Sequence, residues 1–180
     1  MKIFVETERL ILREILPSDD EGMFELDSDP DVHTYLNHPV ETIEQSREII
    51  KSVRQQYTDF GIGRWAMIEK STNAFMGWTG LKFVTTPRNN HKDYYDLGYR
   101  IIKRFWGRGY ATESAIASMD YAFTILPIDT LYAMADVRNL ASRNVLTKTG
   151  FRFTGTFDDE GHETAWYEIG KYEWLLRKKD

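Results

Sequence analysis

Hydrophobic and polar residues alternate along several short stretches of the chain, a period of two that is typical of half-buried β-strands. Other stretches are short apolar runs that end at turn residues, and these also favour strands. A hairpin is predicted where the turn at residues 71–74 joins two such stretches. The predicted strands are residues 7–13, 64–70, 75–84, 95–101, 130–137, 151–157 and 164–176.

Apolar residues that recur every three or four positions predict the helices. The clearest apolar stripe lies in residues 41–58. Thr42 and Gln45, at its start, fit a capping box, in which the side chain of each residue accepts a hydrogen bond from the backbone N–H of the other. Further along, Asn139 is a suitable N-cap and Gly150 a suitable C-terminal stop for a short helix. The predicted helices are residues 17–20 (a turn and the start of a helix), 41–58, 109–123 and 139–150.

In chain order these elements are a strand, helices, three strands, a helix, a strand, a helix and two strands, with a polar loop at residues 87–93. This order predicts an α/β (α+β) fold in which one sheet is covered by helices. The 180 residues contain no repeat, low-complexity tract or linker, and the length suits a single domain spanning residues 1–180. Apolar residues make up 42% of the chain, which is enough for a core and excludes a disordered protein.

The charge balance and the rare residue types exclude several classes of protein. Lys and Arg number 23 against 28 Asp and Glu, a net charge of −5, whereas nucleic-acid-binding domains usually carry a basic surplus. The chain has no cysteine, which excludes disulfides, thiolate metal sites and a cysteine nucleophile, and its four histidines lack metal-ligand spacing. No apolar run approaches the ~18 residues of a membrane span, and the N-terminus lacks a signal-peptide pattern. A cytoplasmic protein without metal or membrane contact is expected.

One segment carries recognisable chemistry: residues 96–113, where a predicted strand runs through Gly107 and Gly109 directly into a helix. Glycines allow backbone N–H groups to converge without a Cβ in the way, and the N-terminus of a helix adds a partial positive charge. This geometry suits a phosphate group, although an ordinary strand-to-helix turn would need the same glycines. The spacing matches no nucleoside-triphosphate loop, and Thr112 stands where a dinucleotide fingerprint has its third glycine. Three basic residues would reinforce phosphate binding: Lys103, Arg104 and Arg108.

The segment RFWGRGYA at residues 104–111 resembles the R/Q-x-x-G-x-G/A signature of the GNAT superfamily of N-acetyltransferases, which bind acetyl-CoA there. The longer pattern W-G-x-G-Y-A-T-E is similar to the branch that contains the ribosomal-protein N-terminal acetyltransferases. Residues 7–13 (TERLILR) resemble the opening strand of that branch, and residues 139–151 resemble its N-x-x-S-x-x-(V/L)-x-x-K-x-G-F helix. The resemblance therefore covers nearly the whole chain in matching order.

This resemblance implies a mixed, mostly antiparallel twisted sheet of about six to seven strands, splayed in the middle and flanked by about four helices. Acetyl-CoA would lie in the gap, with its pantetheine arm along the exposed backbone of residues 99–102 and its pyrophosphate on the amides of residues 106–111. The cofactor-binding residues implied in this way are Tyr99, Ile101, Ile102, Arg104, Trp106, Gly107, Arg108, Gly109, Tyr110, Ala111, Thr112, Asn139 and Ser142.

The resemblance also implies catalytic roles for Asp96 and Ser142. Asp96 stands where this branch often has an acid that orients the amine or a water, and a solvated carboxylate at a strand edge is the alternative. With an ordinary pKa of ~3.9 it would be a poor base for an amine, so holding the ammonium or relaying a proton through water is favoured. Ser142 would position or protonate the departing thiolate, or be a helix-surface residue. Tyr167 could replace the tyrosine acid of other relatives, but a core position is favoured.

Several other residues have ordinary structural interpretations. The acidic run at residues 158–160, with Glu163, is expected to be a solvated loop rather than a site that attracts an amine. Trp65, Trp78 and Trp166 are expected in the core, and Trp106 beside the cofactor.

The predicted function is transfer of the acetyl group of acetyl-CoA to a primary amine by direct attack, without an acyl-enzyme. The resemblance favours a protein or peptide N-terminal amine, and the α-amino pKa of ~7.7–8.0 against ~10.4 for lysine agrees, because more of it is neutral near pH 7. The alternatives are a small-molecule amine, such as an antibiotic or polyamine, and a non-catalytic acyl-CoA sensor. A homodimer is left open, and no nucleic-acid partner is expected.

Overall fold

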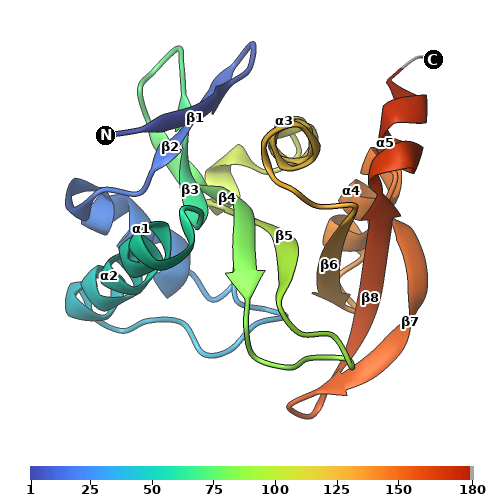
Figure 1. Cartoon of the computed structure of the whole chain (residues 1–180). Coiled ribbons are helices and arrows are strands. Elements are labelled where there is room, and N and C mark those ends of the chain that lie inside the picture. The colour runs from blue at the N-terminus through green and yellow to red at the C-terminus, as the bar shows by residue number, and fades with distance from the viewer. Residues whose placement is uncertain (179–180) are drawn as a thin grey trace.

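The computed structural model describes residues 1–178 and contains one open sheet of 8 strands (Figure 1). The strands lie in the order β1-β2-β3-β4-β5-β6-β8-β7, and β5 and β6 are parallel neighbours in an otherwise antiparallel sheet. The strands are β1 (Ile3–Glu6), β2 (Leu10–Glu14), β3 (Arg64–Glu69), β4 (Phe75–Val84), β5 (Tyr94–Ile101), β6 (Thr130–Asp136), β7 (Arg152–Asp159) and β8 (His162–Gly170).

Helices cover both faces of this sheet. The first two helices pack against β4 from one side, and the third packs against β4 and β5 from the other side (Figure 1). Short 3₁₀ turns at Pro17–Asp19 and Lys103–Phe105 precede the first and the third helix. The helices are α1 (Asp20–Ser28), α2 (Ile43–Phe60), α3 (Tyr110–Ile125), α4 (Leu140–Thr149) and α5 (Lys171–Arg177). None of the helices within residues 1–178 combines the length and the apolar character needed to cross a bilayer.

The predicted helix caps are confirmed. The Thr42 side chain accepts a hydrogen bond from the Gln45 N–H at 3.4 Å, and the Gln45 side chain accepts one from the Thr42 N–H at 3.0 Å. At the start of α4 the Asn139 side chain accepts from a backbone N–H, and Gly150 ends the helix in the left-handed conformation. These local patterns therefore fixed the helix boundaries to within about two residues.

The sheet is larger than the sequence predicted, and the last predicted strand is wrong at its end. β1 has four residues, too few to show an alternating pattern. Residues 1–178 contain 8 strands and five helices rather than about six to seven and about four. Residues 171–176 form α5 instead of extending β8. The Glu173 carboxylate accepts the Gly170 N–H at 2.7 Å, which caps the new helix. Trp174 is buried, with its indole N–H on Asp120 at 3.0 Å.

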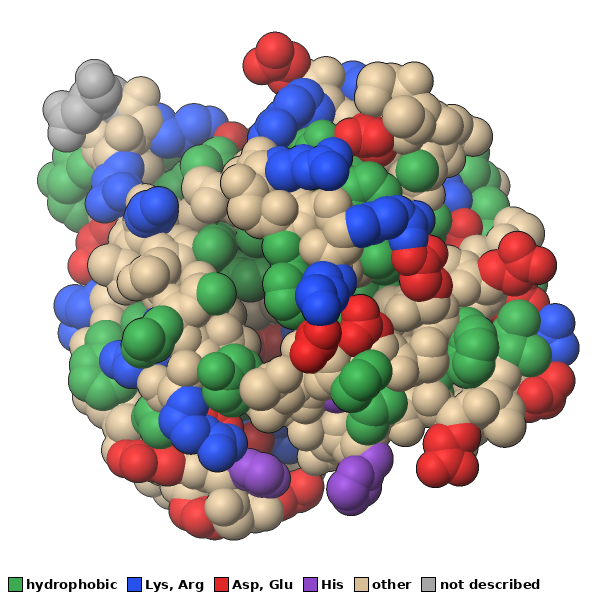
Figure 2. All heavy atoms as spheres, turned by 180° about the vertical axis from the view of Figure 1, so that it is seen from behind, with side chains coloured by type: hydrophobic (Ala, Val, Ile, Leu, Met, Phe, Trp, Pro, Cys, Tyr) green, Lys and Arg blue, Asp and Glu red, His purple; other side chains and the backbone are tan. Residues whose placement is uncertain are grey.

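The sheet opens between β5 and β6. β4 and β5 stay paired from Gly77–Ile101 to Val84–Tyr94, whereas β5 and β6 share a single register pair, Asp96 with Tyr132. Beyond that pair the two parallel strands separate toward their C-terminal ends, as the resemblance implied. Seen from behind, the surface is hollowed between the two halves of the molecule, hydrophobic side chains line the hollow, and Lys and Arg side chains gather beside it (Figure 2).

Candidate functional site

The edge of β5 that faces the gap has free backbone groups. The Ile102 N–H donates to the Met76 carbonyl of β4 at 2.9 Å. Backbone groups alternate in direction along an antiparallel strand, so Tyr99 and Ile101 direct theirs away from β4, into the gap. The Ile101 carbonyl is already engaged, because it accepts the Trp106 indole N–H at 2.6 Å, which leaves the Ile101 N–H. Ile102 was expected to share this role but cannot, because its carbonyl also accepts the Phe105 N–H at 2.9 Å.

The turn between β5 and α3 forms a second set of free donors. Gly107 and Gly109 have φ values of 72° and 81°, left-handed conformations that favour glycine. Within residues 1–178, no hydrogen bond uses the backbone N–H groups of residues 107–112, which lie at and before the N-terminus of α3. Such converging amides at a helix N-terminus bind phosphate groups well. The Trp106 N–H is an exception to the expected set, because it donates to the Lys103 carbonyl at 3.0 Å.

The basic residues near the turn are not equally free. Lys103 pairs with Asp31 and Arg104 with Glu25, both ion pairs reaching across to α1 and the segment after it. Arg108 takes part in no ion pair within the described part of the chain, and its guanidinium lies 5.8 Å from the Phe105 ring. Arg108 is therefore the cation best placed to meet a phosphate, whereas Lys103 and Arg104 would first have to leave their exposed partners.

Two segments that resembled family motifs contact each other directly. The Glu113 carboxylate in the first turn of α3 accepts hydrogen bonds from the Thr7 hydroxyl at 2.6 Å and the Arg9 Nε at 2.7 Å. Arg9 also donates to the Arg108 carbonyl at 3.0 Å and lies 4.3 Å from the Tyr110 ring. The turn before β2 thus fixes the glycine turn. Both motifs are visible in the sequence, but only the fold shows that residues 7–9 hold the turn at residues 107–109 through these hydrogen bonds.

Tyr99 bridges the gap from β5 to α4. Its hydroxyl donates to the Ser142 carbonyl at 2.9 Å and lies 3.1 Å from the Ser142 Oγ. Burial raises the pKa of Tyr99, so the phenol stays protonated and able to donate. The Asn139 Oδ1 accepts the Ser142 N–H at 3.1 Å, which orients this end of α4. Ser142 is therefore a half-buried residue held at the gap, not a helix-surface serine.

Asp96 is a buried ion-pair partner rather than a solvated carboxylate. It is 5% exposed, and its Oδ2 pairs with the Arg64 guanidinium. Arg64 also donates to the Asp96 carbonyl at 2.7 Å and the Gly80 carbonyl at 2.6 Å, which ties β3, β4 and β5 together. Burial raises the pKa of Asp96, while the positive charge of Arg64 opposes that rise. The ordinary pKa assumed from the sequence is therefore wrong, and Arg64 is a site residue that no sequence motif revealed.

The other side of Asp96 is aromatic. Tyr132 is its register partner on β6, and Lys82 is its partner on β4. Tyr94, two residues earlier on β5, is buried, which raises its pKa to about 12, and the negative charge of Asp96 adds to the rise. Aromatic side chains from β5 and β6 therefore lie beside Asp96.

The remaining singled-out residues lie elsewhere or pack as expected. Tyr167 is 2% exposed and its hydroxyl accepts a hydrogen bond from Arg143 at 2.9 Å, which agrees with a core position. Trp65 and Trp166 are buried, but Trp78 is half-buried between two guanidinium groups rather than in the core. Within the acidic run, Asp159 pairs with Arg88 at 3.3 Å.

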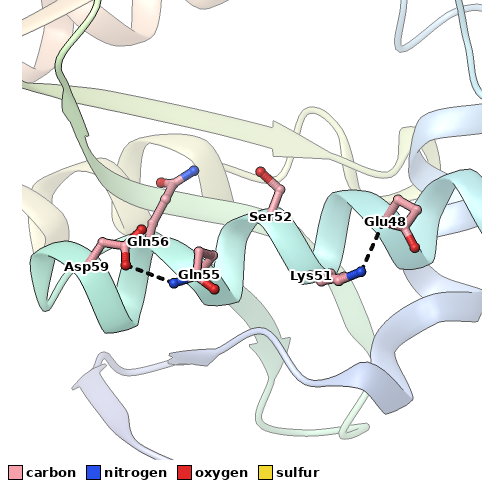
Figure 3. Close-up of a pocket in the computed structure, with 6 residues that line it drawn as sticks. All are labelled: Glu48, Lys51, Ser52, Gln55, Gln56 and Asp59. Carbon is pink, nitrogen blue, oxygen red and sulfur yellow. Dashed lines mark hydrogen bonds and ion pairs between the residues drawn. The ribbon is translucent and has the colours of Figure 1, made fainter.

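A shallow depression of about 400 Å³ lies along α2, away from the residues discussed above (Figure 3). Its polar side chains engage one another along the helix, Lys51 with Glu48 at 3.6 Å and Gln55 with Asp59 at 2.8 Å. It contains none of the predicted site residues. No group of three or more potential metal ligands gathers within residues 1–178.

Comparison with known proteins gives the same assignment. The family model described as "Acetyltransferase (GNAT) domain" matches residues 9–152. The protein YkkB of Bacillus subtilis (strain 168), itself described as uncharacterized, is 30% identical over 167 residues, which cover 92% of this chain and 95% of YkkB. The uncharacterized N-acetyltransferase p20 of Bacillus licheniformis is 29% identical over 154 residues, covering 85% of this chain and 84% of p20.

Solved structures share the fold. A GNAT-family acetyltransferase from Bacillus anthracis superposes with a TM-score of 0.78 at 25% identity, covering 96% of this chain and 99% of that one. RimL, a ribosomal L7/L12 α-N-protein acetyltransferase solved with coenzyme A, has a TM-score of 0.78, covering 94% of this chain and 98% of its own. Its 19% identity supports likeness of fold alone. Because the family model matches most of this chain, the chain belongs to the GNAT family of acetyltransferases.

Proposed function

We propose that the protein transfers the acetyl group of acetyl-CoA to a primary amine that approaches beside Asp96. The residues fit the donor: free amides at residues 107–112 suit the pyrophosphate, and the open edge of β5 at Tyr99 and the Ile101 N–H suits the pantetheine amides. Acetyl-CoA supplies a thioester, whose acetyl carbon a neutral amine can attack. The chain has no cysteine, so the transfer is direct rather than through an acetyl-cysteine.

Asp96 holds and deprotonates the incoming amine. Its raised pKa makes it a better proton acceptor than an ordinary aspartate, and Arg64 keeps its Oδ2 engaged. Within the described residues no hydrogen bond uses its Oδ1, which is the oxygen assigned to the amine or to a bridging water. On the other side of the gap, the hydroxyls of Tyr99 and Ser142 lie 3.1 Å apart and supply a proton donor to the departing thiolate.

One observation carries this proposal. The strand β5 has free backbone groups on its gap side and leads into the glycine turn. It also carries a buried carboxylate, Asp96, at the register pair where the gap begins. An acyl-CoA sensor would need the first feature alone. Arg64 engages only the Oδ2 of Asp96, and the Oδ1 that no hydrogen bond uses within residues 1–178 is what favours a reacting amine there.

The direct test measures CoA release with a thiol-reactive dye across a panel of amines, and the absence of cysteine removes the protein's own background. Asp96→Asn and Ser142→Ala are expected to lower kcat more than they weaken acetyl-CoA binding, with ~10²–10⁴-fold typical for a general acid or base. Binding of acetyl-CoA without turnover of any amine would favour the sensor. Loss of acetyl-CoA binding altogether would remove the assignment.

Two acceptor classes are compatible with this chemistry: a protein or peptide N-terminal amine, and a small-molecule amine. The comparison that separates them is kcat/KM for short peptides with free and blocked N-termini, measured beside polyamines and aminoglycosides. If blocking the terminus changes nothing, or a small amine is preferred a hundredfold, the N-terminal amine is the wrong acceptor.

A further inference from the structure

A tight turn in the loop between β4 and β5 inserts a histidine ring on the acceptor side of Asp96. Arg88 and His91 exchange backbone hydrogen bonds, each at 2.9 Å, and the two residues between them, Asn89 and Asn90, have φ values of 46° and 61°. Two successive left-handed residues closing such a bridge form a type I′ turn, which is a rigid hairpin connection. The loop therefore presents the His91 side chain in a defined position.

The His91 ring lies in a slot made of three aromatic residues. It stacks on Trp166 at 5.0 Å with 26° between the ring planes, and it lies 4.8 Å from Tyr132. The Tyr94 ring meets it edge-on at 6.2 Å. One parallel partner and one perpendicular partner are the preferred surroundings of a flat aromatic ring. A compact cation would instead favour rings that surround it on several sides.

The walls of this slot contain two polar groups without partners. The Tyr94 hydroxyl and the Trp166 indole nitrogen are buried, and neither has a hydrogen-bond partner within residues 1–178. Their residues are 5% and 2% exposed. Leaving such a donor unpaired costs about 1–3 kcal/mol. The Nδ1 of the His91 ring contacts the Asn89 carbonyl at 2.7 Å and neither of these two groups, so the fit of the ring to the slot is aromatic rather than polar.

The slot adjoins the proposed reaction centre. Tyr132, on β6, is the register partner of Asp96. Trp166, on the next strand β8, is the register partner of Met134 on β6. Neighbouring strands lie ~4.8 Å apart, so β8 is about 10 Å from β5 across β6. A ring between Tyr132 and Trp166 would leave room for a linker of about two carbons before an amine reached Asp96.

The hairpin that fills the slot is weakly held. Arg88 pairs with Asp159 at 3.3 Å, with side chains 34% and 25% exposed, and its other contact is the Met134 sulfur at 3.8 Å. Ion pairs with this degree of exposure contribute about 0–1 kcal/mol. Displacing the hairpin therefore costs mainly the stacking of the His91 ring on Trp166 and Tyr132, which a new ring in the slot would replace.

We propose that the slot formed by Tyr94, Tyr132 and Trp166 binds an aryl ring of the acceptor, and that His91 is its internal occupant until the acceptor displaces it. The acceptor chemistry is a primary amine about two carbons from an aromatic ring. This inference rests on the proposed acetyl transfer. A small arylalkylamine and a peptide whose N-terminal residue is aromatic both carry this group.

The kinetic test compares pairs of acceptors that differ only in aromaticity. The small pair is 2-phenylethylamine and 2-cyclohexylethylamine, and the peptide pair is Phe-Gly amide and Leu-Gly amide. At least a tenfold advantage in kcat/KM for the aryl member is expected. The pair with the larger kcat/KM identifies the source. Equal rates within both pairs would overturn the proposal while leaving acetyl transfer intact.

Variants of the hairpin test the role of His91. His91→Ala empties the slot and is expected to lower KM severalfold for the aryl amine, with KM for the cyclohexyl amine unchanged. Lys92→Ala is the control, because this neighbouring side chain is 61% exposed and forms no part of the slot. An equal change for both amines, or no change for either, would contradict the displacement.

A binding experiment separates this proposal from the proposed function. Saturation-transfer NMR with 2-phenylethylamine requires no turnover, and His91→Ala should strengthen the ring-proton signals. Ring binding without acetylation would keep the slot and refute the reaction. Acetylation of aliphatic amines without ring binding would keep the acetyl-transfer reaction and refute the aryl slot.

Discussion

The replacement Arg64→Met tests how the buried carboxylate of the site is maintained. Arg64 and Asp96 have side chains only 12% and 7% exposed, and the guanidinium also holds the carbonyls of Gly80 and Asp96. Methionine reproduces the apolar stem of arginine but provides no charge or donor. The variant would leave Asp96 in place without its partner, apart from the weaker influence of Lys82 and Arg88.

The expected loss of stability is large. Removing one partner of a buried ion pair typically costs 3–5 kcal/mol, because the other charge stays buried. Asp96 can limit the cost by taking up a proton. A further rise in the pKa of Asp96 would accompany a penalty of this size, because the protonated carboxyl no longer needs a cationic partner.

The pH dependence has a defined sign. An unfolded aspartate has a pKa of ~3.9, and that of folded Asp96 is already higher through burial and would rise further in Arg64→Met. Between the unfolded and folded pKa values the folded state binds more protons, so stability falls as pH rises through that window. The deficit of the variant should therefore be small near pH 4 and full near pH 8.

The assay is urea unfolding of wild type, Arg64→Met and the double variant Arg64→Met/Asp96→Asn at several pH values. The double variant should recover at least about 1.5 kcal/mol over Arg64→Met at high pH, because the unpaired charge is gone. Arg13→Met is a matched control: Arg13 and Asp19 form a second buried pair, 13% and 7% exposed, away from the gap. It should lower stability without moving the pH profile of kcat/KM. Wild-type stability of Arg64→Met at high pH, or no rescue by the double variant, would refute the reasoning.

Three further predictions concern the cofactor side. Gly109→Val should weaken acetyl-CoA binding at least tenfold by calorimetry. Gly161→Val is the control: Gly161 has a similar φ of 89° in the remote β7–β8 turn, so both variants should lose ~1–2 kcal/mol of stability to backbone strain, but Gly161→Val should leave binding unchanged. Glu113→Gln should raise KM for acetyl-CoA and cost about 1–2 kcal/mol at pH 7, because the carboxylate anchors the turn before β2. Burial raises the Glu113 pKa, but its hydrogen bonds outweigh this and hold the pKa below the ordinary value. Wild type therefore loses this stabilisation as the pH falls through the Glu113 pKa, and the difference in stability between Glu113→Gln and wild type should vanish there. Tyr99→Phe should lower kcat more than Ser142→Ala if the phenol is the main proton donor, and equal effects of both would assign that role to neither alone.

Local sequence patterns determined the helices, most strands and the glycine turn, because each depends on residues close together in the chain. The capping residues at Thr42 and Asn139 set two helix starts, and Gly107 and Gly109 set the conformation of the turn. The pattern failed at the C-terminus. A run of apolar and polar residues after Gly170 also fits a strand, and the Glu173 cap together with the burial of Trp174 against α3 decided for a helix.

Tertiary structure alone decided the environment of the site. Asp96 reads as an ordinary carboxylate in the sequence, because nothing within the neighbouring residues indicates a guanidinium 32 positions away. The same holds for Glu113, whose partner Arg9 lies 104 positions away, and for the His91 ring seated on Trp166. Burial and pairing across a sheet are set by strand order and register. Those follow from the packing of the whole chain, so the sequence indicated the glycine turn while the fold determined which groups surround the carboxylate.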